Sequence, residues 1–119
     1  MYSAQLLKYF EDRRHAGEVN EPDAVAQVEN PVCGDVLRLT ASVAAGKIAE
    51  IRFKAKGCVP AMACASALAD CLEGRTVEEA GAFRREDLIR AVGGLPQAST
   101  HAGQLAIDAI ASLLTTLPR

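Results

Sequence analysis

Two neighbouring stretches of the chain, residues 35–43 and 48–56, alternate between apolar and polar side chains, and no other feature constrains the fold as strongly. A period of two is typical of β-strands with one buried and one solvent-facing side. Residues 44–47 link the two stretches and include Gly46, as a short hairpin loop usually requires. The pattern predicts an antiparallel hairpin, whose alternating apolar positions are Leu37, Leu39, Ala41 and Val43, then Ala49, Ile51, Phe53 and Ala55.

The position of the turn predicts the register of the hairpin. If the turn is centred between Ala45 and Gly46, the numbers of paired residues add up to roughly 91. Cys33 and Cys58 satisfy this sum, so we expect them to lie side by side at the open end of the hairpin. Asp35, two residues after Cys33, is expected at the same end.

Helices and one further strand are predicted around the hairpin. Residues 3–14 have apolar side chains at helical spacing, residues 24–29 form a short strand, and residues 30–35 form the loop that leads into the hairpin. Pro60 suits the first turn of a helix that ends near Gly74. A capping-box spacing of Thr76 and Glu79 starts a short helix, and another spans residues 86–91.

The last helix has the clearest pattern. Its apolar residues recur at helical spacing between residues 102 and 114, and Ser99 or Thr100 is expected to cap it, which places His101 in its first turn. Together these elements predict one α+β domain over residues 1–119, with helices packed on an antiparallel sheet.

Composition excludes several classes of function. The net charge is −2 and no basic run occurs, so we expect no nucleic-acid binding. No apolar stretch is long enough to cross a membrane, and residues 1–12, with Lys8, Glu11 and Asp12, do not resemble a secretory signal. We therefore expect a cytoplasmic protein, in which four cysteines are ligands, catalysts or core residues rather than disulfides.

Four side chains form the candidate site: Cys33, Asp35, Cys58 and His101. Two thiolates, an imidazole and a carboxylate suffice for a tetrahedral zinc site. The same set could supply two ligands to each iron of a [2Fe–2S] cluster. No C-x-x-C pair is present, however, and a lone cysteine is usually a core residue while a histidine at a helix start is usually a surface residue.

The remaining cysteines, Cys64 and Cys71, are seven residues apart and share a helix face with Leu68. This spacing favours two core residues. Thiol redox chemistry is the alternative.

Several motifs together resemble one known family. They are Asn-Pro-Val-Cys-Gly-Asp at residues 30–35, Phe-Lys-Ala-Lys-Gly-Cys at 53–58, Leu-Pro at 95–96 before His101, and Arg-His-Ala-Gly at 14–17. In this order and spacing they resemble the IscU/NifU-N-type iron–sulfur cluster assembly scaffolds over nearly the whole chain. The interval from Cys58 to His101 resembles the IscU class and is too short for the insertion of the zinc-dependent SufU class.

The resemblance implies a fold and a function. The fold would be a three-stranded antiparallel sheet with helices packed on it. The protein would not be an enzyme but a scaffold that receives sulfur from a cysteine desulfurase, assembles a [2Fe–2S] cluster and passes it to acceptor apo-proteins. Cys33, Cys58 and His101 would be ligands of the cluster or of iron. Asp35 would be either a further ligand or a residue that promotes release of the cluster.

Two positions depart from the family pattern. Ala102 stands where relatives carry a third cysteine, which is the family's main sulfur acceptor. Residues 95–99 keep only the first two residues of the LPPVK-like stretch that a dedicated chaperone binds. Two other interpretations therefore stay open: a zinc-bound paralogue that accompanies a desulfurase, and a thiol sulfurtransferase that uses Cys33, Cys58 or Cys64.

Overall fold

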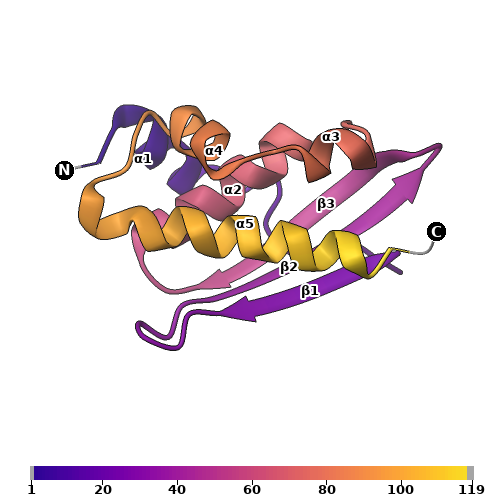
Figure 1. Ribbon diagram of the computed structural model, residues 1–119, viewed down its shortest axis with the longest axis horizontal. Helices are drawn as coiled ribbons and strands as arrows, with labels where there is room; N and C mark the ends of the chain where they lie inside the picture. Colours follow the sequence, from indigo (N-terminus) through magenta and orange to yellow (C-terminus); the bar gives the residue numbers. More distant parts are fainter. Residues whose placement is uncertain (1, 118–119) are drawn as a thin grey trace.

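The computed structural model describes residues 2–117 and consists of a three-stranded antiparallel sheet with helices packed against it, as the α+β prediction required (Figure 1). No helix in this part of the chain is long and apolar enough to cross a membrane. In chain order the elements are α1 (Ala4–Glu11), β1 (Ala24–Glu29), β2 (Val36–Ala44), β3 (Lys47–Lys56), α2 (Val59–Leu72), α3 (Val77–Gly81), α4 (Arg85–Ala91), a 3-10 turn η1 (Gln97–Ser99) and α5 (Thr100–Thr115).

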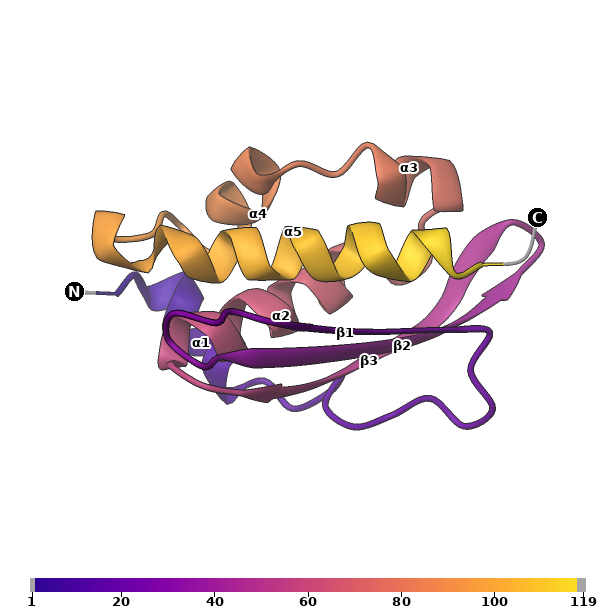
Figure 2. The same ribbon diagram turned by 60° about the horizontal axis from the view of Figure 1, so that its bottom comes forward.

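The strands lie in the order β1-β2-β3, and the long helices cover one face of the sheet. In Figure 2, α5 runs along the length of the sheet, and α3 and α4 lie on the side of α5 away from it. The segment between α1 and β1 passes on the opposite side. There the N–H group of the buried Val19 donates to Thr40 Oγ1 on β2, 2.9 Å away, so this segment closes part of the second face.

Alternation in β2 produces the buried face that the sequence predicts. Leu37, Leu39 and Ala41 are at most 1% exposed. The helix α2 is buried on nearly all sides, as its ten buried residues show. It packs against α1, α4, α5 and β3. Because each side of the helix lies close to a neighbouring element, small side chains are needed on every side.

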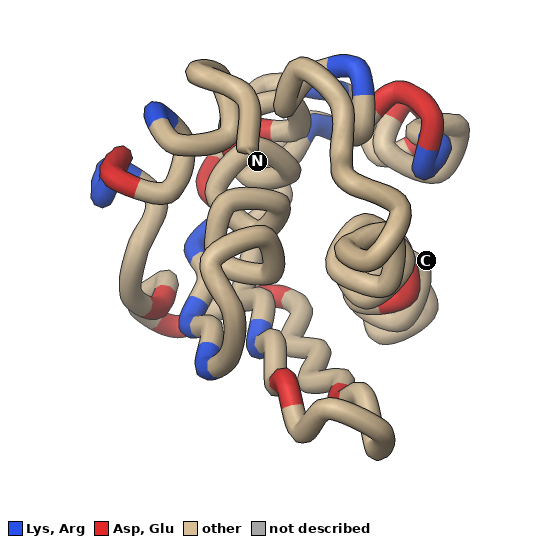
Figure 3. The backbone as a smooth tube through the Cα atoms, turned by 90° about the vertical axis from the view of Figure 1, so that its left-hand side faces the viewer, with Lys and Arg blue, Asp and Glu red and all other residues tan. Residues whose placement is uncertain are grey.

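Charged residues are distributed unevenly over the molecule. Figure 3 shows lysines, arginines and acidic residues spread over strands, loops and the other helices, whereas α5, seen nearly end on, is tan apart from a red segment. The only carboxylate in α5 is that of Asp108. This helix therefore joins the core through apolar contacts, and its buried residues are Ala102, Gly103, Leu105, Ala106, Ala109, Ile110 and Leu113.

The predicted register of the hairpin is wrong by one residue at its open end. Near the turn Val43 pairs with Ile48, as expected, but a β-bulge follows and Ser42 pairs with Glu50. The bulge leaves Ala49 exposed and lets both Ile48 and Ile51 reach the core. From there to Val36, which pairs with Lys56, every pair is shifted by one.

Two helix ends also differ from prediction. The first helix stops at Glu11 rather than residue 14, because Asp12 takes an extended conformation and its carboxylate accepts hydrogen bonds from the N–H group and guanidinium of Arg14. At α5, Ser99 is the N-cap residue but its side chain makes no capping hydrogen bond. The predicted capping box of Thr76 and Glu79 is present at α3.

Candidate functional site

Residues 30–35 form a closed loop at the open end of the hairpin. The Asn30 N–H donates to the Asp35 carbonyl at 2.8 Å, and the Gly34 N–H donates to the Asn30 carbonyl at 2.7 Å. The Asn30 side chain accepts from the Val32 N–H at 3.0 Å, and Gly34 adopts a φ of +78° that favours glycine. The loop leaves Cys33 exposed at its tip and turns the Asp35 side chain inward, where it is 4% exposed.

The junction of β3 and α2 receives the Asp35 carboxylate. The Cys58 N–H donates to Asp35 Oδ1 at 3.3 Å, and the Cys58 thiol lies 3.3 Å from Asp35 Oδ2. Gly57, which precedes Cys58, has a φ of +150°, and a side chain there would overlap with the Asp35 carboxylate. The absence of a side chain at Gly57 therefore makes room for Asp35.

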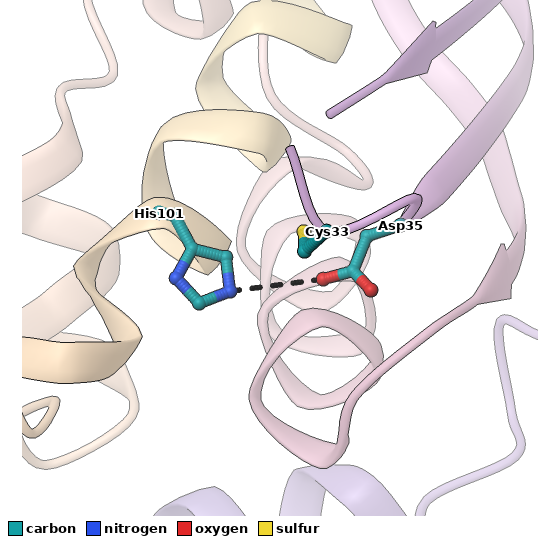
Figure 4. Close-up of side chains that lie close together, drawn as sticks. All are labelled: Cys33, Asp35 and His101. Atoms are coloured by element: carbon teal, nitrogen blue, oxygen red, sulfur yellow. Dashed lines mark ion pairs between the residues drawn. The ribbon is translucent and has the colours of Figure 1, made fainter. Parts of the chain in front are cut away.

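His101 approaches from the first turn of α5. Its Nε2 atom lies 3.7 Å from Asp35 Oδ2 and 3.9 Å from Cys58 Sγ. Figure 4 shows the imidazole edge facing the carboxylate, with Cys33 beside Asp35. Because the first turn of a helix presents unpaired N–H groups, negative charge is favoured near this point.

All four predicted residues meet around Asp35. One ligand atom from each of Cys33, Asp35 and His101 lies within 4.8 Å of the others, and Cys58 contacts both Asp35 and His101. The Asp35 carboxylate lies against Gly57 and accepts from the Cys58 N–H, so it is central, and the two thiols approach it from two different loops.

The environment disfavours the thiolate form of Cys58. Burial raises the pKa of Cys58 most, the Ala61 N–H lowers it, and the hydrogen bond and negative charge of Asp35 raise it again, with a further lowering by the N–H of Cys58 itself, so that the net shift is upward. A cation at this point would remove that penalty, since it would attract both the thiolate and the carboxylate.

The other cysteines and Ala102 lie in different surroundings. Cys64 is fully buried, and burial raises the pKa of its thiol to about 12, so it is the core residue that its spacing predicted. Cys71 is only partly buried and lines a separate cavity between α2 and α4. Ala102 is 1% exposed and belongs to the hydrophobic core.

A family model described as the NifU-like N terminal domain matches residues 1–118. The chain belongs to this family. Its relatives include the iron–sulfur cluster assembly scaffold protein IscU 1 of Archaeoglobus fulgidus, 36% identical over 92% of this chain and 72% of that protein. An IscU scaffold protein of Aquifex aeolicus is 30% identical over 92% of this chain and 71% of its own length.

The fold of the chain matches that of a solved structure. The crystal structure of a nitrogen-fixing NifU-like protein (N-terminal) from Brucella abortus has a TM-score of 0.80, at 20% identity over 97% of this chain and 92% of that one. At this identity the match establishes a common fold. The IscU relatives are described as scaffold proteins, and this agrees with the expectation that the chain is not an enzyme.

Proposed function

We propose that this protein is a scaffold that carries a [2Fe–2S] cluster as its cargo, held by Cys33, Cys58 and His101, with Asp35 as the fourth ligand or as a group that helps to release the cluster. The observation that carries this proposal is the convergence of Cys33, Cys58 and His101 around Asp35, from three segments far apart in the sequence. Membership of the family that includes the IscU scaffolds supports it.

The donor set fits such a cargo. Thiolates are the usual ligands of iron–sulfur clusters, and imidazole can replace some of them. The ligand atoms are 3.3 to 3.9 Å apart in the pairs that involve Asp35 Oδ2, Cys58 Sγ and His101 Nε2, so small shifts of side chains would admit a metal between them. Cys33 is exposed, and a cluster bound there would be open to an acceptor protein.

Cluster assembly needs a residue that accepts sulfur from the desulfurase, and at position 102 the chain has alanine rather than a cysteine. We propose Cys33 as the acceptor, since its thiol is exposed whereas Cys64 is fully buried. In this step the Cys33 thiolate attacks the outer sulfur of a persulfide on a cysteine desulfurase. A new S–S bond forms at Cys33, the S–S bond of the desulfurase breaks, and the desulfurase cysteine leaves as a thiolate.

A resident zinc ion is the second candidate. Two thiolates, one imidazole and one carboxylate are a complete tetrahedral set, and the buried Asp35 at the centre of the site favours a small cation over an extended cluster. The protein would then accompany a desulfurase without building clusters.

Metal analysis of protein purified without oxygen tests these functions. We expect iron and acid-labile sulfide after reconstitution with ferrous iron, cysteine and a cysteine desulfurase, with a visible absorption band that Cys33→Ser, Cys58→Ser and His101→Ala each abolish. Cys71→Ser is the matched control, because it removes a thiol that is remote from the site and should leave the band unchanged. If the protein contains zinc alone and keeps it when iron competes, the zinc-bound function is favoured. If Cys33 carries a persulfide and no metal is bound, a sulfur carrier is favoured.

A further inference from the structure

A cavity of about 330 Å³ lies between β3 and the segment that follows α1, and none of the four candidate metal ligands lines it. Its apolar lining includes Phe10, Phe53 and Met62, and its charged lining residues are Asp12, Arg13 and Lys54. An apolar interior with a few charged groups is typical of a binding site.

The cavity adjoins an open stretch of strand edge. The strand β3 is at the edge of the sheet, and residues 15–17 extend the sheet beside it: Phe53 N–H donates to the His15 carbonyl, and Gly17 N–H donates to the Phe53 carbonyl, both at 2.9 Å. The chain then turns away at Gly17, where φ is +121°. Two residues further along β3, Ala55 points its N–H and carbonyl to the same side.

Within residues 2–117, no main-chain partner beyond β2 pairs with Ala55. The outward groups of β3 nearer the turn are occupied, since Ile48 N–H donates to the Arg75 carbonyl and Ile51 N–H to Glu73 Oε2. The open edge at Ala55 therefore coincides with the cavity, and an extended chain placed there could pair with it.

The charge of the rim is positive. Arg13 forms no ion pair with any residue of the described chain. Asp12, which also lines the cavity, is paired with Arg14, whose guanidinium lies 2.6 Å from its carboxylate. Lys54 lies 3.7 Å from Glu18, but that carboxylate is held more closely by Arg38, at 2.6 Å. A ligand that carries a carboxylate would compensate this charge.

We propose that this cavity is a docking site for an extended segment of a partner protein. The segment would pair with Ala55 as an added strand, insert one apolar side chain between Phe10, Phe53 and Met62, and place an acidic side chain beside Arg13 and Lys54. Strand addition of this kind takes affinity from main-chain hydrogen bonds and specificity from the pocket. Cys58 follows Ala55 by three residues, so the partner would sit next to the cluster site, but docking needs no metal.

Binding of synthetic peptides to the full chain tests the proposal. The probe is a fluorescein-labelled peptide of sequence Thr-Val-Leu-Glu-Val-Thr, blocked at its C-terminus, and anisotropy measures its binding to metal-free protein. Arg13→Glu should weaken binding about fivefold or more, because it replaces attraction by repulsion. Lys47→Glu is the matched control, since it makes the same charge change at an exposed position at the other end of the hairpin.

A charge-reversed peptide, with Lys in place of Glu, should prefer the Arg13→Glu protein to the parent. In amide spectra of the labelled protein, the Ala55 signal should shift on addition of the first peptide, and a proline-substituted peptide should have no effect. Absence of binding at millimolar peptide, equal weakening by Arg13→Glu and Lys47→Glu, or shifts confined to other residues would each overturn the proposal. Self-association of the chain that competes with the peptide would assign the edge to a second copy instead and overturn it as well.

Discussion

The geometry of the candidate site depends on the side chain of Asp35. It is buried, it accepts from the Cys58 N–H, and it lies within 4 Å of the Cys58 thiol and the His101 imidazole. Gly57 makes this position possible, because any side chain there would occupy the space of the carboxylate.

Replacing Gly57 by alanine should therefore destabilise the protein by about 1 to 3 kcal/mol, through overlap with Asp35 and a backbone conformation that L-residues rarely adopt. Chemical denaturation measures the change. Gly46→Ala is the control, since Gly46 also has a positive φ, of +77°, but its side chain would meet nothing within 4 Å. In an Asp35→Ala background the cost of Gly57→Ala should fall, and additive effects of the two changes would contradict this account.

The Cys58 thiol should respond to pH in a way that Asp35 controls. Since burial and Asp35 raise the pKa of Cys58 above its ordinary value, less thiolate is present at a given pH in metal-free protein than at an ordinary cysteine. We expect slow alkylation of Cys58 by iodoacetamide at pH 8.5, followed by peptide mass spectrometry, and faster alkylation in Asp35→Asn.

The sign of the stability effect follows from the same shift. The neutral thiol is favoured in the folded state, so its contribution is fully present below about pH 9 and is lost as the pH rises through the raised pKa of Cys58. Equal alkylation rates in Asp35→Asn and the parent would show that Asp35 does not control this thiol.

Ala102→Cys tests whether Ala102 stands in the place of a third cysteine, as the resemblance to the scaffold family implies. A cysteine there would lie in the first turn of α5, next to His101, where helix N–H groups favour a thiolate. Ala102 is buried, but so is Asp35, which nevertheless faces the site. We expect a reconstituted cluster with a longer-lived visible absorbance than in the parent. If the cluster absorbance lasts equally long in the parent and in a correctly folded variant, the site binds another metal, of which zinc is the first candidate.

At the scale of the elements, the cysteines of α2 and of its N-cap position differ in role: one contacts the candidate site and another is buried in the core. Cys58 stands at its N-terminus and contacts the site, whereas Cys64 lies one and a half turns further on with no exposed surface. Cys71, near the other end of the helix, is partly exposed.

Cys64→Ala should lower the free energy of unfolding by about 1 kcal/mol, because it leaves a small void in a packed core. Cys71→Ala should cost less, because its side chain already contacts solvent. Urea denaturation measures both, and metal content should match the parent in each variant. Loss of bound metal in Cys64→Ala would show that this thiol supplies a ligand.

At the scale of the whole molecule, the site exists only when three parts of the fold are assembled. The loop before β2, the start of α2 and the start of α5 each contribute side chains, and they are separated by long stretches of sequence. The unfolded chain therefore has no preformed site, and metal binding must favour the folded state.

Addition of zinc to metal-free protein should raise the thermal unfolding midpoint. At a free metal concentration of a hundred times Kd the stabilisation is about 2.7 kcal/mol. Scanning calorimetry should show this shift in the parent and in Cys71→Ser, and should show a smaller shift in His101→Ala. A full shift in His101→Ala would exclude this histidine as a ligand.

Much of this fold follows from local sequence alone. Alternation at residues 36–41 defines β2, Thr76 and Glu79 form the capping box of α3, and the strand at residues 24–29 has the predicted bounds. These features depend on neighbours within a few residues, so their physical causes are present in any short window of the chain.

Other features were decided only by tertiary packing. The bulge at Ala49 arises because Ile48 and Ile51, three residues apart, are both buried, and local alternation cannot satisfy both. That single residue shifts the register of every pair from Ser42 and Glu50 to Val36 and Lys56. Likewise, the number of residues between Cys58 and His101 does not predict how far apart the two side chains lie in space. That distance is set by the packing of α5 along the sheet. The sequence by itself determined which residues could bind a metal, and packing of distant apolar surfaces determined that they meet around one carboxylate.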